Sequence, residues 1–344
     1  MNRRAFTTKV TFGSLVISSL LSSKAYTQTE QRIFPKRLQK GDTLGLITPG
    51  SYIPDKALEK AISNLKTLGF KIRLGKNIRA KRGFNAGTDA ERLEDLHAMF
   101  ADPAIAGIWC ARGGYGCSRI LPQIDYDLIK KNPKVILGYS DITALLQAIY
   151  LKTGLVGFHG PVGASEMTDY TRENLWPLLV DAKAKHHIKL AEENKNKDNK
   201  AYQTKVLQAG KSEGILIGGN LSLLAALAGT AYAIDATDKI VFMEDIGEKP
   251  YRIDRMLTQL RQTANLDKAA GIALGIFADC ESDGKAPSLS LEETLRDRLG
   301  DLGVPVIYGL SFGHIDNMCT IPVGAKASLD TEKQLLSIEE AVVR

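Results

Sequence analysis

The sequence predicts an α/β protein built from two domains, and three observations support this fold class. The chain has 344 residues, about the length of two domains. Short apolar runs alternate with longer segments in which apolar residues recur every three or four positions, a pattern typical of strand–helix units. Residues 181–205 break the alternation, because this segment is rich in lysines and contains few apolar residues. We therefore expect a first domain at 26–180, a linker at 181–205 and a smaller α/β domain at 206–344.

The first domain is expected to contain a parallel sheet. A strand that is followed by a helix and then by another strand places the two strands parallel, with helices on both faces of the sheet. This arrangement is Rossmann- or flavodoxin-like. Strands are predicted at 43–48, 70–74, 107–110 and 135–138, and helices at 56–68, at 88–100 and soon after residue 138.

The second domain repeats the alternation after the predicted linker, which we interpret as an exposed connection or surface hairpin. Its predicted strands are 214–220, 240–243, 271–277 and 304–308, and its predicted helices are 221–227, 251–262 and 291–299.

The first 25 residues have the pattern of a secretory signal peptide. A basic start is followed by an apolar, Ser-rich run at 10–21 and by a small-x-small cleavage site at Ser23–Ala25. The run is shorter than the roughly 18–20 residues that cross a bilayer, so we expect export to the periplasm without stable membrane association. The Arg3-Arg4 pair is also a feature of twin-arginine signals.

Charge and cysteine content exclude several other classes of protein. Four of the six excess positive charges lie in the first 25 residues, so the remainder has no basic surface of the kind that binds nucleic acid. The four cysteines have no disulfide-framework or zinc spacing, and we expect buried free thiols. The five histidines form no metal-binding pattern with them, so no metal or cofactor is expected. The sequence leaves the oligomeric state open, a homodimer included.

The sharpest local feature is the segment VILGYSDITALLQAIY at 135–150. An apolar strand runs into Gly138, and a helix begins almost at once, so Ser140 is predicted to lie at a strand-to-helix corner. A nucleophilic serine of a hydrolase occupies such a corner, beside the free N–H groups of the helix. The alternative is that Ser140 or Asp141 is only the N-cap of the helix.

Other polar residues are predicted at the ends of strands. The loop ARGGYG at 111–116 could bring backbone N–H groups close to an anion. Glu244 and Asp245 end the strand 240–243, where strand alternation lets only one of them face His314. His314 lies just past the strand 304–308. A serine, an acid and a histidine in this chain order are compatible with a catalytic triad. Asp245 competes with Glu244 for the acid, and His159 competes with His314 for the base.

Six ordered motifs resemble those of the LD-carboxypeptidase family, serine peptidases that trim murein tetrapeptides and include microcin C immunity peptidases as a side branch. The motifs are ARGGYG (111–116), GYSDIT (138–143), GFHGP (157–161), GGNLSLLAALAGT (218–230), EDIGEKPYRIDRMLTQL (244–260) and FGH (312–314). The resemblance extends from about Leu44 to Val323, and Cys117 departs from the Ser or Ala expected there. It implies a two-domain enzyme with Ser140 as nucleophile, Glu244 as acid and His314 as base.

The same resemblance implies how a substrate would be held. The oxyanion would be met by the N–H groups of Asp141 and of Gly113 or Gly114. Because the acid and base belong to the second domain, we expect the site in a cleft between the domains. Three further residues are expected to bind a small peptide that ends in a D-amino acid: Arg112, which would meet its carboxylate, Tyr115 and Asn220.

Three functions are compatible with the sequence. The first is a periplasmic L,D-carboxypeptidase that releases terminal D-alanine from murein tetrapeptides. The second is a related peptidase that acts on peptide- or aminoacyl-nucleotide conjugates. The third is a periplasmic solute-binding protein without turnover, which would also have two α/β lobes and a signal peptide.

Overall fold

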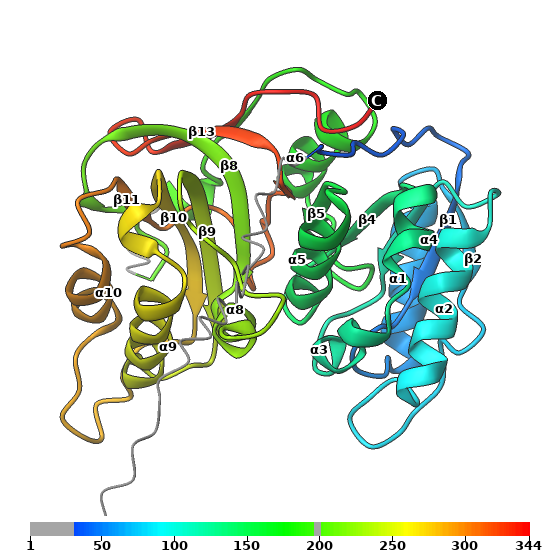
Figure 1. The fold of residues 1–344 in the computed structure, drawn as a ribbon, viewed down its shortest axis with the longest axis horizontal. Helices are drawn as coiled ribbons and strands as arrows, with labels where there is room; N and C mark the ends of the chain where they lie inside the picture. Colours follow the sequence, from blue (N-terminus) through cyan, green and yellow to red (C-terminus); the bar gives the residue numbers. More distant parts are fainter. Residues whose placement is uncertain (1–30, 196–200) are drawn as a thin grey trace, which may run out of the picture. The chain divides into compact units, whose positions relative to one another are not determined.

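The computed structural model describes residues 31–195 and 201–344 (Figure 1). Residues 32–344 form one compact unit that contains two sheets, one of six strands and one of eight. The expected signal peptide at 1–25 lies outside the described residues. Within the described ranges, no helix has both the length and the apolar character needed to cross a membrane.

The six-stranded sheet contains the parallel arrangement that the sequence predicts. Its order is β12-β5-β4-β3-β1-β2, and all neighbours are parallel except β12, which is antiparallel to β5. The order of its first five strands is that of flavodoxin-like folds. The elements of this half are β1 (Thr43–Ile47), α1 (Asp55–Thr67), β2 (Lys71–Leu74), α2 (Asp89–Ala101), β3 (Gly107–Cys110), α3 (Cys117–Ile120), α4 (Tyr126–Lys131), β4 (Val135–Gly138), α5 (Ile142–Thr153), β5 (Gly157–His159) and α6 (Asp169–Leu179).

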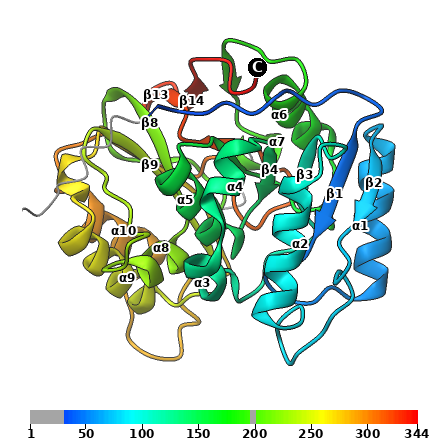
Figure 2. The same cartoon turned by 45° about the vertical axis from the view of Figure 1, so that its right-hand side comes forward.

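Local sequence explains why these elements begin and end where they do. Helix α2 begins after Thr88, whose hydroxyl accepts a hydrogen bond from the N–H of Glu91, while the Glu91 carboxylate accepts the N–H of Thr88. Helix α5 ends at Gly154, which adopts the left-handed conformation at φ 76°. In Figure 2, α1 and α2 lie on opposite sides of β1 and β2, as expected for a doubly wound sheet.

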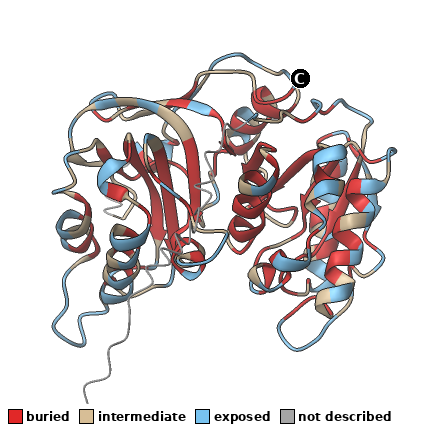
Figure 3. Ribbon diagram, in the orientation of Figure 1, coloured by how far each residue is buried: buried red, intermediate tan, exposed pale blue. Residues whose placement is uncertain are grey.

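The eight-stranded sheet is mixed. Its order is β6-β14-β13-β8-β9-β10-β11-β7, and only β8, β9, β10 and β11 are parallel to one another. Strands β9 and β10 are almost entirely buried (Figure 3). The elements are β6 (His186–Ile188), α7 (Glu192–Lys195), β7 (Lys205–Gln208), β8 (Lys211–Asn220), α8 (Leu221–Leu227), β9 (Lys239–Ile246), α9 (Pro250–Thr263), β10 (Gly271–Ala278), α10 (Leu291–Leu299), β11 (Val306–Tyr308), β12 (Ile321–Val323), β13 (Lys326–Asp330) and β14 (Leu335–Ile338).

Three features differ from the sequence prediction. Strand β9 extends to Ile246, so it does not end at Glu244 and Asp245 as predicted. Strand β12 comes from the second half of the chain but pairs with β5 of the first sheet. The segment 181–205 contains β6 and α7 and ends on the first residue of β7, and β6 pairs with β14 at the edge of the eight-stranded sheet. The division into two domains remains a prediction.

Candidate active site

Ser140 lies at the corner between β4 and α5. Its φ of 62° is in the left-handed region, which is uncommon for a residue other than glycine and is typical of a strained nucleophile corner. The capping alternative is not supported, because Asp141 occupies the N-cap position without a side-chain capping bond. Instead, Asp141 Oδ2 accepts the N–H of Cys117 at 2.9 Å. The Ser140 hydroxyl is therefore available for chemistry.

The three residues of the predicted triad form one chain of hydrogen bonds. His314 Nε2 lies 3.1 Å from Ser140 Oγ, and His314 Nδ1 lies 2.8 Å from Glu244 Oε2. Ser140 follows a strand of the six-stranded sheet, whereas Glu244 is on β9 of the eight-stranded sheet. The geometry is that of a nucleophile, a base and an orienting acid, in which the base contacts both other groups.

A sharp turn after β11 brings His314 to Glu244. The N–H of Ile276 donates to the carbonyl of Phe312 at 2.8 Å, which holds the turn against β10. Gly313 then adopts φ 124°, and a Cβ there would lie only 2.7 Å from the Ile276 carbonyl oxygen and 3.3 Å from Glu244 Cβ. Glycine is needed at this position, since any side chain would push the turn away from the acid.

The electrostatics of His314 suit a general base that must accept a proton. Burial lowers the pKa of the imidazole, but the hydrogen bond and the negative charge of Glu244 outweigh burial and raise it above its ordinary value. The Glu244 carboxylate is fully buried and would stabilise an imidazolium at this position.

Strand alternation separates Glu244 from its neighbour. Asp245 points to the other face of β9, where its carboxylate accepts bonds from the side chain of Asn220 and from the N–H and hydroxyl of Ser222. Burial and the charge of Glu244 raise the pKa of Asp245 to about 6. Only Glu244 contacts His314, as strand alternation predicts.

His159, the rival for the base, is fully buried on β5 between aromatic rings. Its ring packs edge-on against Tyr139 and Phe242, with centroids 6.1 Å and 5.2 Å away. Neither ring nitrogen has a hydrogen-bond partner, and burial lowers the pKa of His159 to about 4. His314, and not His159, therefore bonds the Ser140 hydroxyl.

The glycine-rich loop lies directly against the Ser140 corner. A Cβ on Gly113 would lie 3.0 Å from the Tyr139 carbonyl oxygen, 3.1 Å from Ser140 Cβ and 3.3 Å from the Asp141 nitrogen. The sequence interpretation missed Ser51, which fixes this loop: its N–H donates to the Gly113 carbonyl at 3.1 Å, and its hydroxyl accepts the N–H of Tyr115 at 3.0 Å. The position of Ser51 is a signal that could have found it. Ser51 follows β1, and the glycine-rich loop follows β3, the neighbour of β1 in the sheet. The strand order reverses between these two strands, which is where ligands bind in such sheets.

The three predicted substrate-binding residues have different surroundings. Arg112 is half-buried and donates to the Tyr52 carbonyl at 2.9 Å. Tyr115 is exposed and packs edge-on against Phe84, at 5.0 Å between centroids. Asn220 pairs in register with Glu244 but is buried, with its side chain engaged by Asp245 and by the N–H of Leu223. Their binding roles remain predictions.

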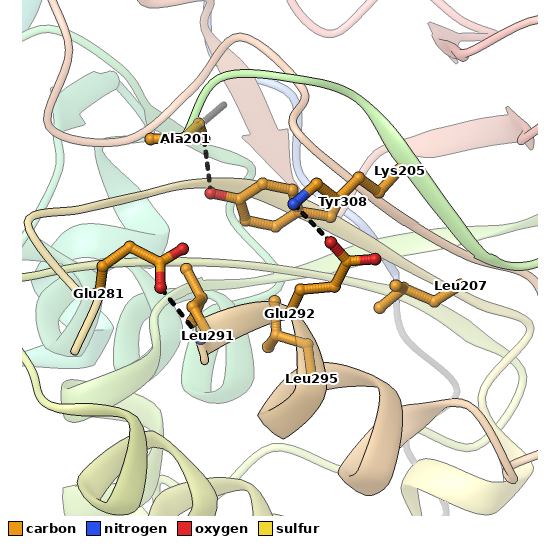
Figure 4. Close-up of a pocket in the computed structure, with 8 residues that line it drawn as sticks. All are labelled: Ala201, Lys205, Leu207, Glu281, Leu291, Glu292, Leu295 and Tyr308. Atoms are coloured by element: carbon orange, nitrogen blue, oxygen red, sulfur yellow. Dashed lines mark hydrogen bonds and ion pairs between the residues drawn. The ribbon is translucent and has the colours of Figure 1, made fainter. Parts of the chain in front are cut away.

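Metal-binding side chains, the cysteines and the pocket of Figure 4 are the other candidate parts of a site in the described residues. No cluster of three or more His, Cys, Asp or Glu side chains in those residues could hold a metal. All four cysteines are buried and free. The pocket of Figure 4 is small, at about 10 Å³, and is lined by packing residues: Tyr308 donates to the Ala201 carbonyl at 2.8 Å, and Lys205 pairs with Glu292 at 2.7 Å. No residue of the triad lines it.

Comparison with known proteins identifies relatives along most of the chain. Residues 44–160 match the LD-carboxypeptidase N-terminal domain, and residues 213–329 match the LD-carboxypeptidase C-terminal domain. The probable murein peptide carboxypeptidase of Bacillus subtilis is 42% identical, over 90% of this chain and 95% of that protein. The murein tetrapeptide carboxypeptidase of Pseudomonas aeruginosa is 34% identical, over 83% of this chain and 92% of that protein. The solved structure of MccF in complex with glutamyl sulfamoyl guanosine superposes with a TM-score of 0.82 at 28% identity, covering 90% of this chain and 99% of that one.

Proposed function

Because the chain belongs to the LD-carboxypeptidase family, we propose that it is a serine-type L,D-carboxypeptidase that releases terminal D-alanine from murein tetrapeptides. The observation that carries this proposal is the continuous hydrogen-bond chain from Ser140 through His314 to Glu244. The name of the Pseudomonas relative supports the choice of substrate.

The proposed reaction proceeds through an acyl-enzyme. Ser140 Oγ bonds to the scissile carbonyl carbon while its proton passes to His314 Nε2. The tetrahedral intermediate collapses when the C–N bond breaks and His314 returns the proton to the departing amine of D-alanine. Water then attacks the ester with His314 again as base, and the shortened peptide leaves. Glu244 holds the imidazole tautomer and stabilises its charge in both half-reactions.

The negative oxygen of each tetrahedral intermediate would be bound by backbone N–H groups. Asp141 occupies the N-cap of α5, where backbone N–H groups have no partner within the helix. The Gly113 position lies beside this nitrogen, so the N–H groups of Gly113 or Gly114 complete the proposed oxyanion hole. Each such donor lowers the barrier by about 3–4 kcal/mol.

A free C-terminal carboxylate would be recognised by a cation near this loop. Arg112 precedes the glycines, and among the described residues no carboxylate pairs with its guanidinium. Lys81 lies over the ring of Tyr52 at 4.2 Å, so a second cation is close to the residue whose carbonyl Arg112 binds. We assign the substrate carboxylate to Arg112.

Two other functions make different predictions. Similarity to MccF bound to glutamyl sulfamoyl guanosine favours an aminoacyl-nucleotide substrate as the second candidate. A solute-binding protein would need no activated serine, so the bonded triad argues against that class.

We also propose that the protein is exported and that its mature form begins near Tyr26, following the small-x-small site at Ser23–Ala25. Cell fractionation followed by intact-mass analysis tests this. A periplasmic species that retains residues 1–25 would contradict it.

The direct test of the substrate is incubation of the purified protein with a murein tetrapeptide, with enzymatic detection of free D-alanine. Ser140→Ala is the matched control, and an aminoacyl sulfamoyl nucleoside is the competing substrate. The proposal predicts D-alanine release by the native protein alone. Cleavage of the nucleoside conjugate without D-alanine release would favour the second candidate, and binding of either without cleavage would favour a solute-binding role.

A further inference from the structure

Arg92 is a buried cation that the mechanism above does not use. It is on the second turn of α2, and its side chain is 1% exposed. Its Nη1 donates to the carbonyl of Pro49 at 2.7 Å and to the carbonyl of Gly116 at 2.8 Å, while its Nη2 pairs with Asp89. Burial of a guanidinium is costly, and Nε of Arg92 has no hydrogen-bond partner among the described residues. A role beyond stability would explain why a cation is buried at this position.

The two carbonyls belong to the two loops that meet at the Ser140 corner. Pro49 lies in the loop after β1, and Gly116 ends the glycine-rich loop after β3. The loops are joined to each other by the two Ser51 bonds described above. Beyond Gly116, the N–H of Cys117 donates to Asp141, the residue after the nucleophile. Arg92 is therefore bonded to both loops.

The glycine-rich loop depends on such external bonds. Gly114 has φ 101° and Gly116 has φ 122°, conformations that few other residues adopt. Glycine has many alternative conformations, so the backbone alone does not fix where the N–H groups of this loop point. A planar guanidinium donates to two carbonyls in fixed directions, whereas the ammonium of a lysine rotates and fixes no directions.

We infer that Arg92 is a positioning residue that aims the N–H groups of Gly113 and Gly114 at the oxyanion by fixing the Pro49 and Gly116 carbonyls. The inference rests on the serine mechanism proposed above. It predicts that loss of the two bonds from Arg92 to these carbonyls weakens stabilisation of the tetrahedral intermediate more than it weakens substrate binding.

Asp89 and Arg119 provide a matched control. Asp89 accepts two bonds from Arg119, at 3.1 Å and 3.0 Å, and these ion pairs lower the pKa of the Asp89 carboxyl. The side chain of Arg119 thus bonds the same Asp89 carboxylate as Arg92, but it is half-exposed and bonds neither loop carbonyl. Only the backbone N–H of Arg119 donates to the Gly116 carbonyl, at 3.2 Å, and a change of side chain keeps this bond. Arg119→Gln removes a charge from the same network and leaves in place the bonds of Arg92 to the Pro49 and Gly116 carbonyls.

The experiment uses two readouts, D-alanine release from the murein tetrapeptide and the rate at which a fluorophosphonate probe labels Ser140. In labelling, Ser140 Oγ bonds to phosphorus, fluoride leaves, the proton passes to His314, and the phosphoryl oxygen occupies the oxyanion position. Arg92→Lys should lower kcat and the labelling rate at least about tenfold with KM within about threefold, whereas Arg119→Gln should stay within about twofold of the native protein.

A second variant covers the outcome in which Arg92→Lys does not fold. Gly116→Ala keeps the guanidinium, but its Cβ would lie 2.5 Å from Asn85 Oδ1 and 2.8 Å from Arg92 Nη1, so it disturbs the contact of Arg92 with this loop. Gly229→Ala, at φ 80° with nothing within 4 Å of the new Cβ, is its control. Gly116→Ala should show the same slow labelling, and Gly229→Ala should not.

Labelling at the native rate in Gly116→Ala, or in folded Arg92→Lys, would overturn the inference. A loss of rate that only follows the folded fraction, measured by thermal unfolding, would also overturn it. If the native protein is labelled quickly but releases no D-alanine, the substrate proposal fails while the role of Arg92 is still tested by labelling.

Discussion

The proposed nucleophile and the proposed acid–base pair are built in different ways. Ser140 belongs to one continuous strand–corner–helix unit, β4 to α5, whose neighbours in the sheet are parallel strands. Glu244 and His314 are 70 residues apart in the sequence and meet through a strand and a turn of the mixed sheet. Antiparallel strand β12 then returns to the first sheet beside β5.

This difference separates local from long-range determinants of the site. The position of Ser140 follows from a short segment, so changes near it should alter chemistry without unfolding the chain. The positions of Glu244 and His314 depend on sheet pairing and on a glycine turn. Variants on the two sides therefore test whether the parts operate as one unit.

The largest effect is expected from removing either end of the Ser140–His314 bond. Ser140→Ala and His314→Ala should each lower kcat for D-alanine release by at least about 10⁴-fold, because residues that act as a unit fail together. The free energy of unfolding of Ser140→Ala should change by less than about 1 kcal/mol, since the side chain has little packing to lose. Steady-state kinetics and chemical denaturation check both expectations, and substantial turnover in either variant would break the assignment.

The next effect compares the two carboxylates of β9. Glu244→Gln should lower kcat by about 10³–10⁴-fold, because a neutral amide cannot stabilise the imidazolium. Asp245→Asn should cost no more than about tenfold, since its carboxylate bonds Asn220 and Ser222 on the other face of the strand. Measurement of kcat for the two variants on one tetrapeptide decides which carboxylate is the acid. The reverse ranking would show that Asp245 is the acid.

A smaller effect is expected where the glycine-rich loop meets the corner. Gly113→Ala would place a Cβ 3.0 Å from the Tyr139 carbonyl oxygen, so the loop must move by a few tenths of an ångström. We expect kcat to fall by about 10–100-fold with little change in KM, because oxyanion donors act on the transition state. A change in KM alone would place this loop in substrate binding only.

The pH dependence tests the coupling of His314 to Glu244. General-base catalysis needs neutral His314, and its pKa is raised by Glu244 despite burial, so kcat/KM should rise with pH through a value above 6.5. Glu244→Gln removes the charge of Glu244, keeps burial and leaves only the smaller raising effect of Asp245, so the midpoint should move to lower pH. The rate of fluorophosphonate labelling from pH 5 to 9 measures both midpoints. Equal midpoints in the two proteins would contradict the coupling.

Among the candidate triad residues and their rivals, the smallest effect on activity is expected at His159. His159→Phe should lower kcat by about threefold to tenfold at most, because His159 has no bond to Ser140. Its folded pKa of about 4 lies below that of the unfolded chain, so the unfolded state takes up the proton first as pH falls from 6.5 to 4. Native stability should fall over this window by roughly 2–3 kcal/mol more than that of His159→Phe. Urea titrations at several pH values measure it, and parallel curves would contradict the buried neutral state.

The sequence predicted the features that have local signals. The strand 135–138 matches β4, and the predicted helix 88–100 matches α2, which begins after Thr88. The burial of both carboxylates on β9 could not be predicted, because two acids at a strand end look like the start of a solvated loop until their buried partners are known. Strand β12 has three residues and pairs with β5 more than 150 positions earlier in the chain, a contact with no local signal. Arg92 resembles any charged residue on a helix, since its acceptors are backbone carbonyls.

The central claim is that a serine from one sheet and a histidine from the other operate as a single catalytic unit. The most direct test is D-alanine release from a murein tetrapeptide by Ser140→Ala, His314→Ala and the double variant, all confirmed as folded. The account predicts that the double variant is no slower than either single variant, within about threefold. If the two losses multiply in the double variant, the residues contribute independently and the triad account is wrong.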